Sequence, residues 1–388
     1  MLFKSPEFIT SQLSFQFVDP IISAAILIIA AVFVLLKRKK NIFLMKKINF
    51  SSSVIIILAV FFFLAPVIAG SNPEFQKNLS VTKLLPPLSQ VKVIHLKAES
   101  AGESKMNGFF ILKNKVVRRS FDENIIFADS VKTDSAITIF QGDMQTVLPK
   151  EKVVFENGGP LVTTKFFLLG TDEYGRDIFS RLIYGARISL FVGLGSVLVS
   201  MLLGILLGFL AGYPGGIVDS SLSRLTDMFL AFPVIFFIIL IIALFGSSLF
   251  SIIVVLGFSG WMSLFKIVRG EVISLKNKDY FVTARMVGLS KSKLLTKEIL
   301  PVIAAPVIVN LVFQYGNVIL AEAALSYLGL GTGSSYPSWG AMIESGQNYL
   351  SQAWWMILFP GLALFLTLFA ANDLGKEINS YFNPRLKT

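Results

Sequence analysis

Three amide side chains, which can donate and accept hydrogen bonds, occur inside an apolar segment of this chain. Asn310, Gln314 and Asn317 follow one another at spacings of four and three within the apolar stretch 302–321, so one face of a helix would carry all three. An amide that faces hydrocarbon is costly, and this face is therefore expected to meet protein or water. Two interpretations stay open: hydrogen bonds between helices, or the lining of a polar pathway. Glu322, just past this face, is expected at the outer interface of the membrane.

A second set of polar side chains falls in residues 170–181, GTDEYGRDIFSR. Thr171 and Asp172 are residue types that cap helices, and an amphipathic stretch follows them. The charged side chains of this segment can form charge-assisted hydrogen bonds near the outer interface. The positions that define the motif are Gly170, Thr171, Asp172, Gly175, Arg176, Asp177, Ser180 and Arg181.

The residues that most often carry catalysis or bind metals are scarce in this sequence. The chain has no cysteine and a single histidine, His95, which excludes disulfides, thiolate metal sites and any site built from several histidines. His95 falls in a strand-like run and is expected to be an ordinary strand residue. No GxxxxGK[ST] phosphate loop, HExxH or GxSxG motif occurs. We therefore assign no catalytic residue, no metal site and no bound cofactor to this chain.

The composition indicates that lipid is the main solvent of this chain. Of its 388 residues, 54% are hydrophobic and 15% are charged, and the mean hydropathy is +0.71, whereas soluble proteins carry about 25% charged residues. A spanning helix needs about 20 mostly apolar residues. The stretches that meet this requirement are 19–36, 52–70, 187–212, 226–246, 249–267, 302–321 and 353–371.

Basic residues set the predicted direction of these spans. Loop 37–51 carries six basic residues and no acidic one, and the segment 268–301 and the C-terminal end are also basic. By the positive-inside rule these three regions lie in the cytoplasm, which places the C-terminus inside and the N-terminus outside. The net charge of +11 is explained in this way, and binding to nucleic acid is not expected.

Small residues recur at every fourth position of the third apolar stretch: Ser196, Ser200, Gly204, Gly208 and Gly212. On a helix they form one slowly drifting stripe. Small stripes let helix backbones approach closely in lipid, so this span is expected to be a central, tightly packed helix.

Segment 71–165 differs in kind from the rest. It alternates short β-branched runs with charged residues and turns, which favours strands. The predicted strands are Val91–Ile94, Val116–Val117, Ala136–Phe140 and Val153–Phe155. We therefore expect a small β-rich domain on the extracytoplasmic side.

The stretch 278–301, KDYFVTARMVGLSKSKLLTKEILP, is expected on the cytoplasmic side. Asp279 is a candidate N-cap for a short helix through Val287, and Gly288 would end that helix because glycine tolerates the left-handed conformation. A second helix then leads back to the membrane. A short exposed helix between two spans can transmit force to a docked partner. The side chains expected on its exposed surface are Tyr280, Phe281 and Met286.

Further motifs follow in order: GYPGGIVDSSLSRLTD at 212–227, EAALSYLGL at 322–330, PSWGAM at 337–342, NDLG at 372–375 and NPRL at 383–386. With this order of motifs, residues 166–388 resemble the permease subunit of binding-protein-dependent ABC importers. The narrower resemblance is to the second, C-type permease of the oligopeptide, dipeptide and nickel group. Similar permeases have one span before the outer loop, whereas this chain adds a span and a larger outer segment.

In that family the stretch within 268–301 is the EAA loop, whose coupling helix inserts into an ATP-binding subunit. Val282 stands here where the family has Glu, and Glu298 stands where it has His, which weakens a usual polar contact without removing the docking itself. The residues that the resemblance assigns to ATPase coupling are Asp279, Tyr280, Thr283, Ala284, Arg285, Gly288, Leu289, Ser290, Leu300 and Pro301.

The resemblance implies an all-α polytopic membrane protein with a type I importer core, about seven transmembrane helices and a small β-rich extracytoplasmic insertion. The expected parts are an extra span with a basic loop at 1–51, a transmembrane helix at 52–70, an extracytoplasmic domain at 71–165 and a permease core with five helices at 166–388.

The implied partners are a homologous permease subunit in a heterodimer, two ABC ATPase subunits that bind ATP and Mg²⁺, an extracytoplasmic substrate-binding protein and membrane lipid. The implied setting is the bacterial inner membrane, and the implied cargo is a short peptide moved by alternating access, with nickel chelates or other small solutes as alternatives. Two other functions stay open. A self-sufficient secondary transporter would need intramembrane acids or inverted repeats, and a membrane-anchored sensor or assembly factor would work through 71–165.

Overall fold

The computed structural model of the chain describes residues 49–97, 124–133, 136–156, 158–290, 293–331 and 337–382. Four predicted features lie outside these residues: the span 19–36, nearly all of the basic loop 37–51, the strand Val116–Val117 and the motif 383–386. The chain divides into two compact units. Ile57–Ile188 and Ser334–Ala363 belong to the first unit, and Lys47–Ile56, Ser189–Gly333 and Leu364–Thr388 belong to the second.

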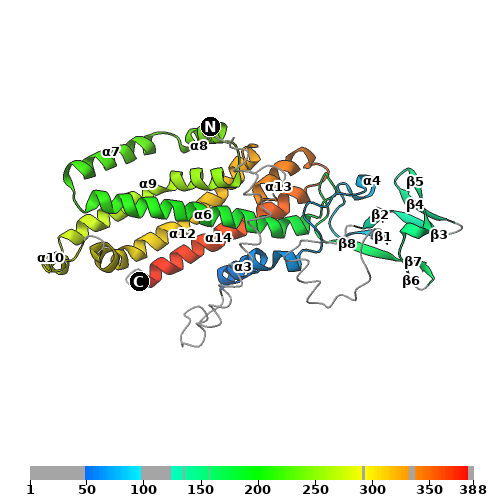
Figure 1. Cartoon of the computed structure of the whole chain (residues 1–388), viewed down its shortest axis with the longest axis horizontal. Helices are drawn as coiled ribbons and strands as arrows, with labels where there is room; N and C mark the ends of the chain where they lie inside the picture. The colour runs from blue at the N-terminus through cyan, green and yellow to red at the C-terminus, as the bar shows by residue number, and fades with distance from the viewer. Residues whose placement is uncertain are drawn as a thin grey trace, which may run out of the picture. The chain divides into compact units, whose positions relative to one another are not determined.

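Within the described residues, five helices are long and apolar enough to cross a membrane (Figure 1). They are α3 (Phe50–Ile68), α6 (Ile178–Gly212), α9 (Leu249–Lys276), the stretch Leu294–Tyr327 and α14 (Trp355–Phe382). The stretch Leu294–Tyr327 starts with a π-helical turn, Leu294–Ile299, and continues as α12 (Leu300–Tyr327). Five of the predicted apolar stretches overlap these helices, which confirms the all-α membrane fold in its main elements.

The predicted span over 226–246 is present as a bent pair of helices rather than as one continuous helix. The pair consists of α7 (Gly216–Ala231) and α8 (Val234–Phe245), bent by 88° at the break between them. Pro233 causes this break, because proline offers no backbone N–H and pushes the residue before it out of the helical region. Phe232 accordingly has an extended backbone, with φ −91° and ψ 130°. Most of the motif at 212–227 lies within α7.

The stripe of small residues on α6 packs against α9, as the sequence predicts. Ser200 Oγ donates a hydrogen bond to the Gly257 carbonyl over 2.5 Å, and a Cβ added at Gly204 or Gly208 would come within 2.8 Å of a side chain on α9. The partners of Gly204, Gly208 and Gly212 on α9 are Leu264, Val268 and Val272, respectively. Because both sets of numbers rise together, α6 and α9 run parallel, in agreement with the predicted directions of the third and fifth spans.

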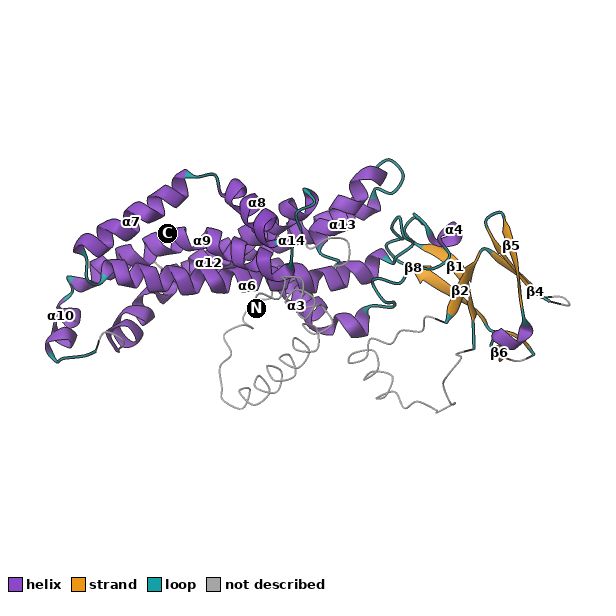
Figure 2. Ribbon diagram, turned by 45° about the horizontal axis from the view of Figure 1, so that its top comes forward, coloured by secondary structure: helices purple, strands orange, loops and turns teal. Residues whose placement is uncertain are grey.

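The strands that the structure describes lie between α3 and α6 in the sequence (Figure 2). In one sheet β1 (Ser89–His95) is the central strand and pairs antiparallel with β2 (Ile125–Ala128) and β8 (Val162–Phe167). The remaining strands are β3 (Ser130–Thr133), β4 (Ile137–Gln141) and β5 (Met144–Leu148), which form a second antiparallel sheet, and β6 (Phe155–Glu156) and β7 (Gly159–Pro160).

Alternating burial explains why these strands form. Val91, Val93 and Phe127 are buried in one hydrophobic cluster, whereas Ile94 and Ile139 are buried in another. This pattern confirms the predicted strands Val91–Ile94 and Ala136–Phe140 in β1 and β4. In the predicted strand Val153–Phe155, Val153 makes only an isolated bridge to Leu96, and the strand β6 starts at Phe155.

Three short helices complete the described part of the chain: α4 (Leu79–Thr82), α10 (Asp279–Met286) and α13 (Trp339–Gly346). Two turns of 3-10 helix, Lys150–Lys152 and Gln347–Tyr349, accompany them. α10 lies between α9 and the π-helical turn that precedes α12, where the sequence predicts a short cytoplasmic helix.

Candidate functional site

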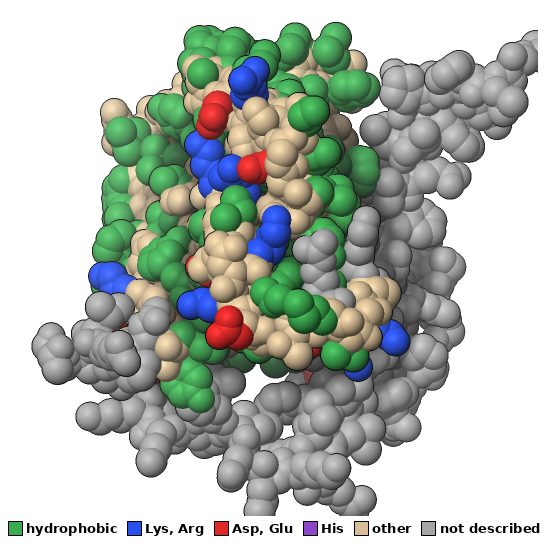
Figure 3. All heavy atoms as spheres, turned by 90° about the vertical axis from the view of Figure 1, so that its left-hand side faces the viewer, with side chains coloured by type: hydrophobic (Ala, Val, Ile, Leu, Met, Phe, Trp, Pro, Cys, Tyr) green, Lys and Arg blue, Asp and Glu red, His purple; other side chains and the backbone are tan. Residues whose placement is uncertain are grey.

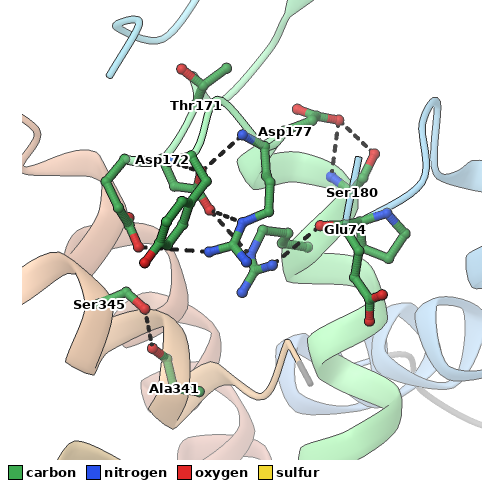
Figure 4. Close-up of polar contacts among 12 residues, drawn as sticks. Glu74, Thr171, Asp172, Asp177, Ser180, Ala341 and Ser345 are labelled. Atoms are coloured by element: carbon green, nitrogen blue, oxygen red, sulfur yellow. Dashed lines mark hydrogen bonds and ion pairs between the residues drawn. The ribbon is translucent and has the colours of Figure 1, made fainter. Parts of the chain in front are cut away.

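The motif at 170–181 forms a buried network around one carboxylate (Figure 4). Asp172 accepts hydrogen bonds from Arg176 Nε over 2.6 Å and from the backbone N–H groups of Tyr174 and Arg176, both over 2.9 Å. Arg181 Nε lies 3.6 Å from the same carboxylate. Asp172, Arg176 and Arg181 are at most 3% exposed. Buried charges persist only when they are paired and hydrogen-bonded, so this network fixes the turn that precedes α6.

The turn also fits closely against α4. Gly175 has φ +70° and lies so near Thr82 that an added Cβ would come within 2.1 Å of Thr82 Oγ1. Only glycine combines that backbone conformation with so close an approach. Thr171 Oγ1 donates to the Thr82 carbonyl over 2.5 Å and accepts from the Leu85 N–H over 2.8 Å. Thr171 thus joins the motif to the α4 loop.

Asp177, rather than Thr171 or Asp172, caps α6. Its carboxylate accepts hydrogen bonds from the backbone N–H groups of Phe179 and Ser180, the groups that a helix leaves without partners at its first turn. Ser180 Oγ and Ser71 Oγ also donate to it, over 2.5 and 3.3 Å. The predicted capping residues Thr171 and Asp172 do not cap α6, because the intervening turn places them before the helix.

The PSWGAM motif packs on the same structure. Trp339 Nε1 donates to the Leu182 carbonyl over 3.0 Å, and a Cβ at Gly185 would come within 2.4 Å of the Pro337 carbonyl oxygen. Trp355 Nε1 donates to the Thr171 carbonyl over 3.0 Å. Two motifs about 160 residues apart in the sequence therefore hold one another in place, and both act as framework within the first unit.

The second polar group lies where α6, α9 and α12 meet in the second unit. Gln314 Nε2 on α12 donates to Ser200 Oγ on α6 over 2.6 Å. Gly260 on α9 leaves the room for this amide, because a Cβ there would lie 1.7 Å from Gln314 Nε2. Asn310 Nδ2 reaches Ser263 Oγ on α9 over 3.4 Å. Gln314 therefore makes the interhelical hydrogen bond that was one of the two interpretations of the amide face.

The three predicted amides do not share one environment. Asn317 is exposed, whereas Asn310 and Gln314 are partly buried. The side-chain oxygens Asn310 Oδ1 and Gln314 Oε1 are buried and make no hydrogen bond within the described residues. Sequence reasoning missed Gly260 and Ser263, and the only available signal for them was their place on an apolar helix facing the amides.

Glu322, which is predicted at the outer interface, is instead fully buried, with 0% exposure. It accepts hydrogen bonds from Ser189 Oγ on α6 over 3.2 Å and from Ser326 Oγ over 2.9 Å. Ser326 lies one turn further along α12, so the acid and this hydroxyl share one helix face. Packing of α6 on α12 covers the carboxylate, which a linear count of apolar residues could not show.

The predicted cytoplasmic helix is present as α10. Gly288 ends it with φ +81°, and the Leu289 N–H donates back to the Ala284 carbonyl over 3.4 Å, the six-to-one bond of a Schellman ending. The helix begins at Asp279 itself, whose side chain lies in the first turn, and the Lys278 carbonyl accepts the first backbone bonds. Asp279 therefore favours the helix through its charge near the N-terminus rather than as the N-cap.

One face of α10 is buried against its neighbours, and the other face is exposed. Phe281 is only 2% exposed and is buried with Leu275, Leu294 and Ile299, so its predicted exposure was wrong. These three apolar side chains, which come from the segments before and after α10, cover the Phe281 ring. Tyr280 is 46% exposed and Met286 is 82% exposed, as predicted. The end view in Figure 3 shows hydrophobic side chains beside lysine and arginine on the face that contains α10.

The remaining coupling residues surround this helix. Thr283 Oγ1 donates to the Asp279 carbonyl over 2.9 Å, and Ser290 Oγ accepts from the Lys293 N–H over 3.4 Å. Leu289 packs against the buried cluster around Phe281. Leu300 and Pro301 form the first turn of α12, where a proline is tolerated because it has no intrahelical N–H partner to lose. Among the described residues, Phe281 and Leu289 thus join α10 to the buried cluster that also contains Leu294 and Ile299.

Comparison with known proteins gives this arrangement a family. Residues 204–388 match the family of binding-protein-dependent transport system inner membrane components. The dipeptide transport system permease protein DppC of Bacillus subtilis (strain 168) is 39% identical over 219 residues, which cover 56% of this chain and 68% of that protein. The chain belongs to this family. The permease also shares 42% identity over 216 residues with the oligopeptide transport system permease protein OppC of Escherichia coli (strain K12), covering 56% and 72% of the two chains.

A third relative agrees with these two. A putative peptide transport system permease protein of Brucella suis biovar 1 (strain 1330) is 39% identical over 220 residues, which cover 57% of the permease and 74% of that protein. The family resemblance stated from the motifs is thereby confirmed. The permease is a membrane-spanning subunit of an ABC importer of the inner membrane, which works with a substrate-binding protein and with ATP hydrolysis on a separate subunit.

Proposed function

We propose that the permease forms, together with a second homologous permease subunit, the path by which short peptides enter the cytoplasm. The names of the Bacillus subtilis and Escherichia coli relatives, a dipeptide and an oligopeptide permease, support this cargo class. Nickel chelates and other small solutes are the alternatives. The proposed heterodimer would be driven by two ATPase subunits, which bind ATP and Mg²⁺, and fed by an extracytoplasmic binding protein.

The observation that carries the proposal is the bare apolar surface of α10. Val282, Met286 and Val287 are 39%, 82% and 77% exposed, next to Tyr280. A short helix that shows this much apolar surface outside the apolar spans is suited to a groove on a soluble partner. Because Phe281 ties α10 to the buried cluster at the ends of α9 and α12, movement of a partner would pass directly to these helices.

The direction of the spans follows from the same proposal. An ATPase can reach α10 only from the cytoplasm, so α9 must run inward and α12 outward. α6 runs parallel to α9, so the start of α6, the motif 170–181 and the strands belong outside. The C-terminus then lies in the cytoplasm, and the first predicted span would put the N-terminus outside.

A cavity near Asn310 is the proposed inner part of the peptide path. It has a volume of about 480 Å³ and lies among α9, α12 and α14. Glu271, Asn310 and Asn379 give it polar walls, and Pro306 and Phe313 give it apolar ones. Mixed walls of this kind suit a chain of peptide groups and side chains. Gln314 and Asn317 do not line this cavity, and Asn317 is proposed to face the path from its exposed position.

Purification of the full-length permease from native membranes tests the proposal. We expect ATPase subunits, a second permease and a binding protein to co-purify, and short peptides to stimulate ATP turnover. In a Met286→Asp, Val287→Asp variant, charges on α10 should release the ATPases. A Met144→Asp, Val147→Asp variant carries matched changes at two exposed apolar residues of β5 and should retain them. Peptide uptake driven by protons or sodium with the chain alone would overturn the proposal.

A further inference from the structure

A second cavity lies between the strands and the start of α6, entirely within the first unit. Its volume is about 570 Å³, and its walls come from β1, β2, β8, the segment after α3 and the first residues of α6. This size falls in the range of small-molecule sites, roughly 300–1,000 Å³. None of the functions assigned above uses it.

One wall of the cavity holds a cation without a hydrogen-bond acceptor. Lys165 on β8 is partly buried, and its Nζ lies 5.1 Å from the ring centroid of Phe167 and 5.4 Å from that of Phe127. The faces of the two rings attract the ammonium group, but they offer no oxygen or nitrogen lone pair to its three N–H donors. Within the described residues, no hydrogen bond or ion pair reaches Nζ. Burial lowers the pKa of Lys165, and the charge of Asp177 opposes that shift.

The same cavity holds a fixed anion. Asp177, 9% exposed, is held by Ser180 and Ser71 at its Oδ2 atom. Its Oδ1 atom accepts only the Phe179 N–H, over 3.3 Å, among the described residues. A carboxylate oxygen can accept more than one such bond, so Oδ1 retains capacity toward the cavity that Asp177 lines.

Apolar side chains form much of the remaining wall. Phe75 follows α3, Val93 and Ile125 come from β1 and β2, and Phe166 and Phe179 flank Lys165 and Asp177 in the sequence. A site with one cation, one anion and apolar walls selects a small molecule that carries both charges and an apolar group, because each charge would then meet its opposite as water leaves.

We propose that this cavity binds a small zwitterionic molecule of the amino acid or short peptide class, with its carboxylate at Lys165 and its ammonium group at Asp177. This site does not rest on the proposed transport function, because the residues that line it are different from those that line the cavity near Asn310. A free amino acid and a dipeptide share the chemistry that it recognises, and the test separates them.

Binding to the full-length permease in lipid nanodiscs, without ATPases, tests this site by calorimetry. The probes are glycyl-L-leucine, its C-terminal amide, its N-acetyl derivative and L-leucine. We expect saturable binding of glycyl-L-leucine or L-leucine, and affinity lower by about tenfold or more for the amide and the acetyl form, since each lacks one charge-assisted bond. Equal affinity for the zwitterion and both blocked forms, or no binding of any probe, would overturn the proposal.

Variants on the strands identify the site. Lys165→Met should abolish binding of the zwitterion, and Lys165→Arg should retain it. Lys92→Met is the matched control, because Lys92 is an exposed lysine of the neighbouring strand β1 that does not line the cavity. Unchanged binding by Lys165→Met would contradict the proposal. Since no ATPase is present, failure of this assay leaves the proposed transport function intact.

Discussion

Arg187 on α6 donates a hydrogen bond from Nε to the Phe62 carbonyl of α3 over 2.6 Å, and a second from Nη2 to the Phe63 carbonyl over 3.1 Å. In an uninterrupted helix the N–H of residue 66 would donate to Phe62, but Pro66 has none. The guanidinium group therefore takes the place of the missing donor. This pairing explains how a charged side chain with 1% exposure persists within a spanning helix.

Loss of this pair should weaken the attachment of α3 to α6. We expect Arg187→Leu to lower stability by about 2–3 kcal/mol, because two carbonyl groups lose a charged donor. Pro66→Ala returns a backbone donor to Phe62, so the double variant should lose less than Arg187→Leu alone. Thermal unfolding of the four proteins in one detergent measures this coupling. Strictly additive losses would show that Arg187 does not compensate for Pro66.

The crossing of α6, α9 and α12 predicts a steric effect at Gly260. Gly260→Ala should displace the Gln314 amide from Ser200 and lower stability by about 1–3 kcal/mol. Gly270→Ala is the matched control on the same helix, because an added Cβ there meets nothing within 4 Å, and it should be neutral or slightly stabilising. If Gln314→Ala fails to relieve the Gly260→Ala defect, the decisive clash is with Ser200 Oγ, which lies 2.6 Å from the same Cβ, and not with that amide.

The exposed and buried amides of α12 should respond differently to removal. Asn317→Leu is expected to lower peptide uptake with little change in unfolding temperature, since Asn317 is exposed. Gln314→Leu should lower the unfolding temperature, because the hydrogen bond from Gln314 Nε2 to Ser200 Oγ is lost. Uptake by the reconstituted complex and thermal unfolding are measured for both. Normal uptake with lowered stability in Asn317→Leu would assign that amide to packing.

The ending of α10 predicts an uncoupled variant. Gly288→Val places a β-branched residue at φ +81°, where left-handed backbone costs about 1–2 kcal/mol. An added Cβ meets nothing within 4 Å, so the effect is conformational rather than steric. We expect membrane insertion to stay normal, with ATP turnover no longer linked to peptide uptake. Gly288→Asn tolerates this conformation better and should transport normally, and normal transport by Gly288→Val would refute the proposed role of the cap.

Glu173 predicts a pH dependence of stability. Burial and the neighbouring Asp172 raise the pKa of Glu173 above its usual value. The folded protein thus keeps this proton to a higher pH than the unfolded chain does, and the resulting stability, full below the ordinary glutamate pKa, is lost as pH rises through the raised pKa. Glu173→Gln should remove this part of the pH dependence in thermal unfolding. An identical pH profile for both proteins would contradict the assignment.

Local sequence signals predicted some of these features well. The end of α10 at Gly288 was predictable because it depends on one residue. The backbone there is left-handed, and glycine adopts that conformation readily. The packing face of α6 was also predictable, because a stripe of small residues with a period of four marks such a face whichever helix packs on it. The structure shows that this helix is α9. The order of the motifs likewise identified the family.

Features that depend on distant neighbours escaped prediction. Phe281 is buried by side chains on both sides of its loop, and Glu322 is buried by α6, which precedes it by more than 100 residues. Asp177 could be mistaken for an ordinary member of its motif because Thr171 and Asp172 are equally good capping types. The break at Pro233 lies within a strongly apolar run, where composition alone favoured one span.

The close approach of α6 and α9 has a mechanical consequence. With hydroxyl groups bonded across the seam near Ser200 and glycines seated on α9 side chains at three successive positions, neither helix can slide or roll without clashes along its length. The two helices are therefore expected to move together as one rigid body. Bending during a transport cycle is then expected where helices are interrupted. Two such places in the described part of the chain are the break before Pro233 and the π-helical turn before α12.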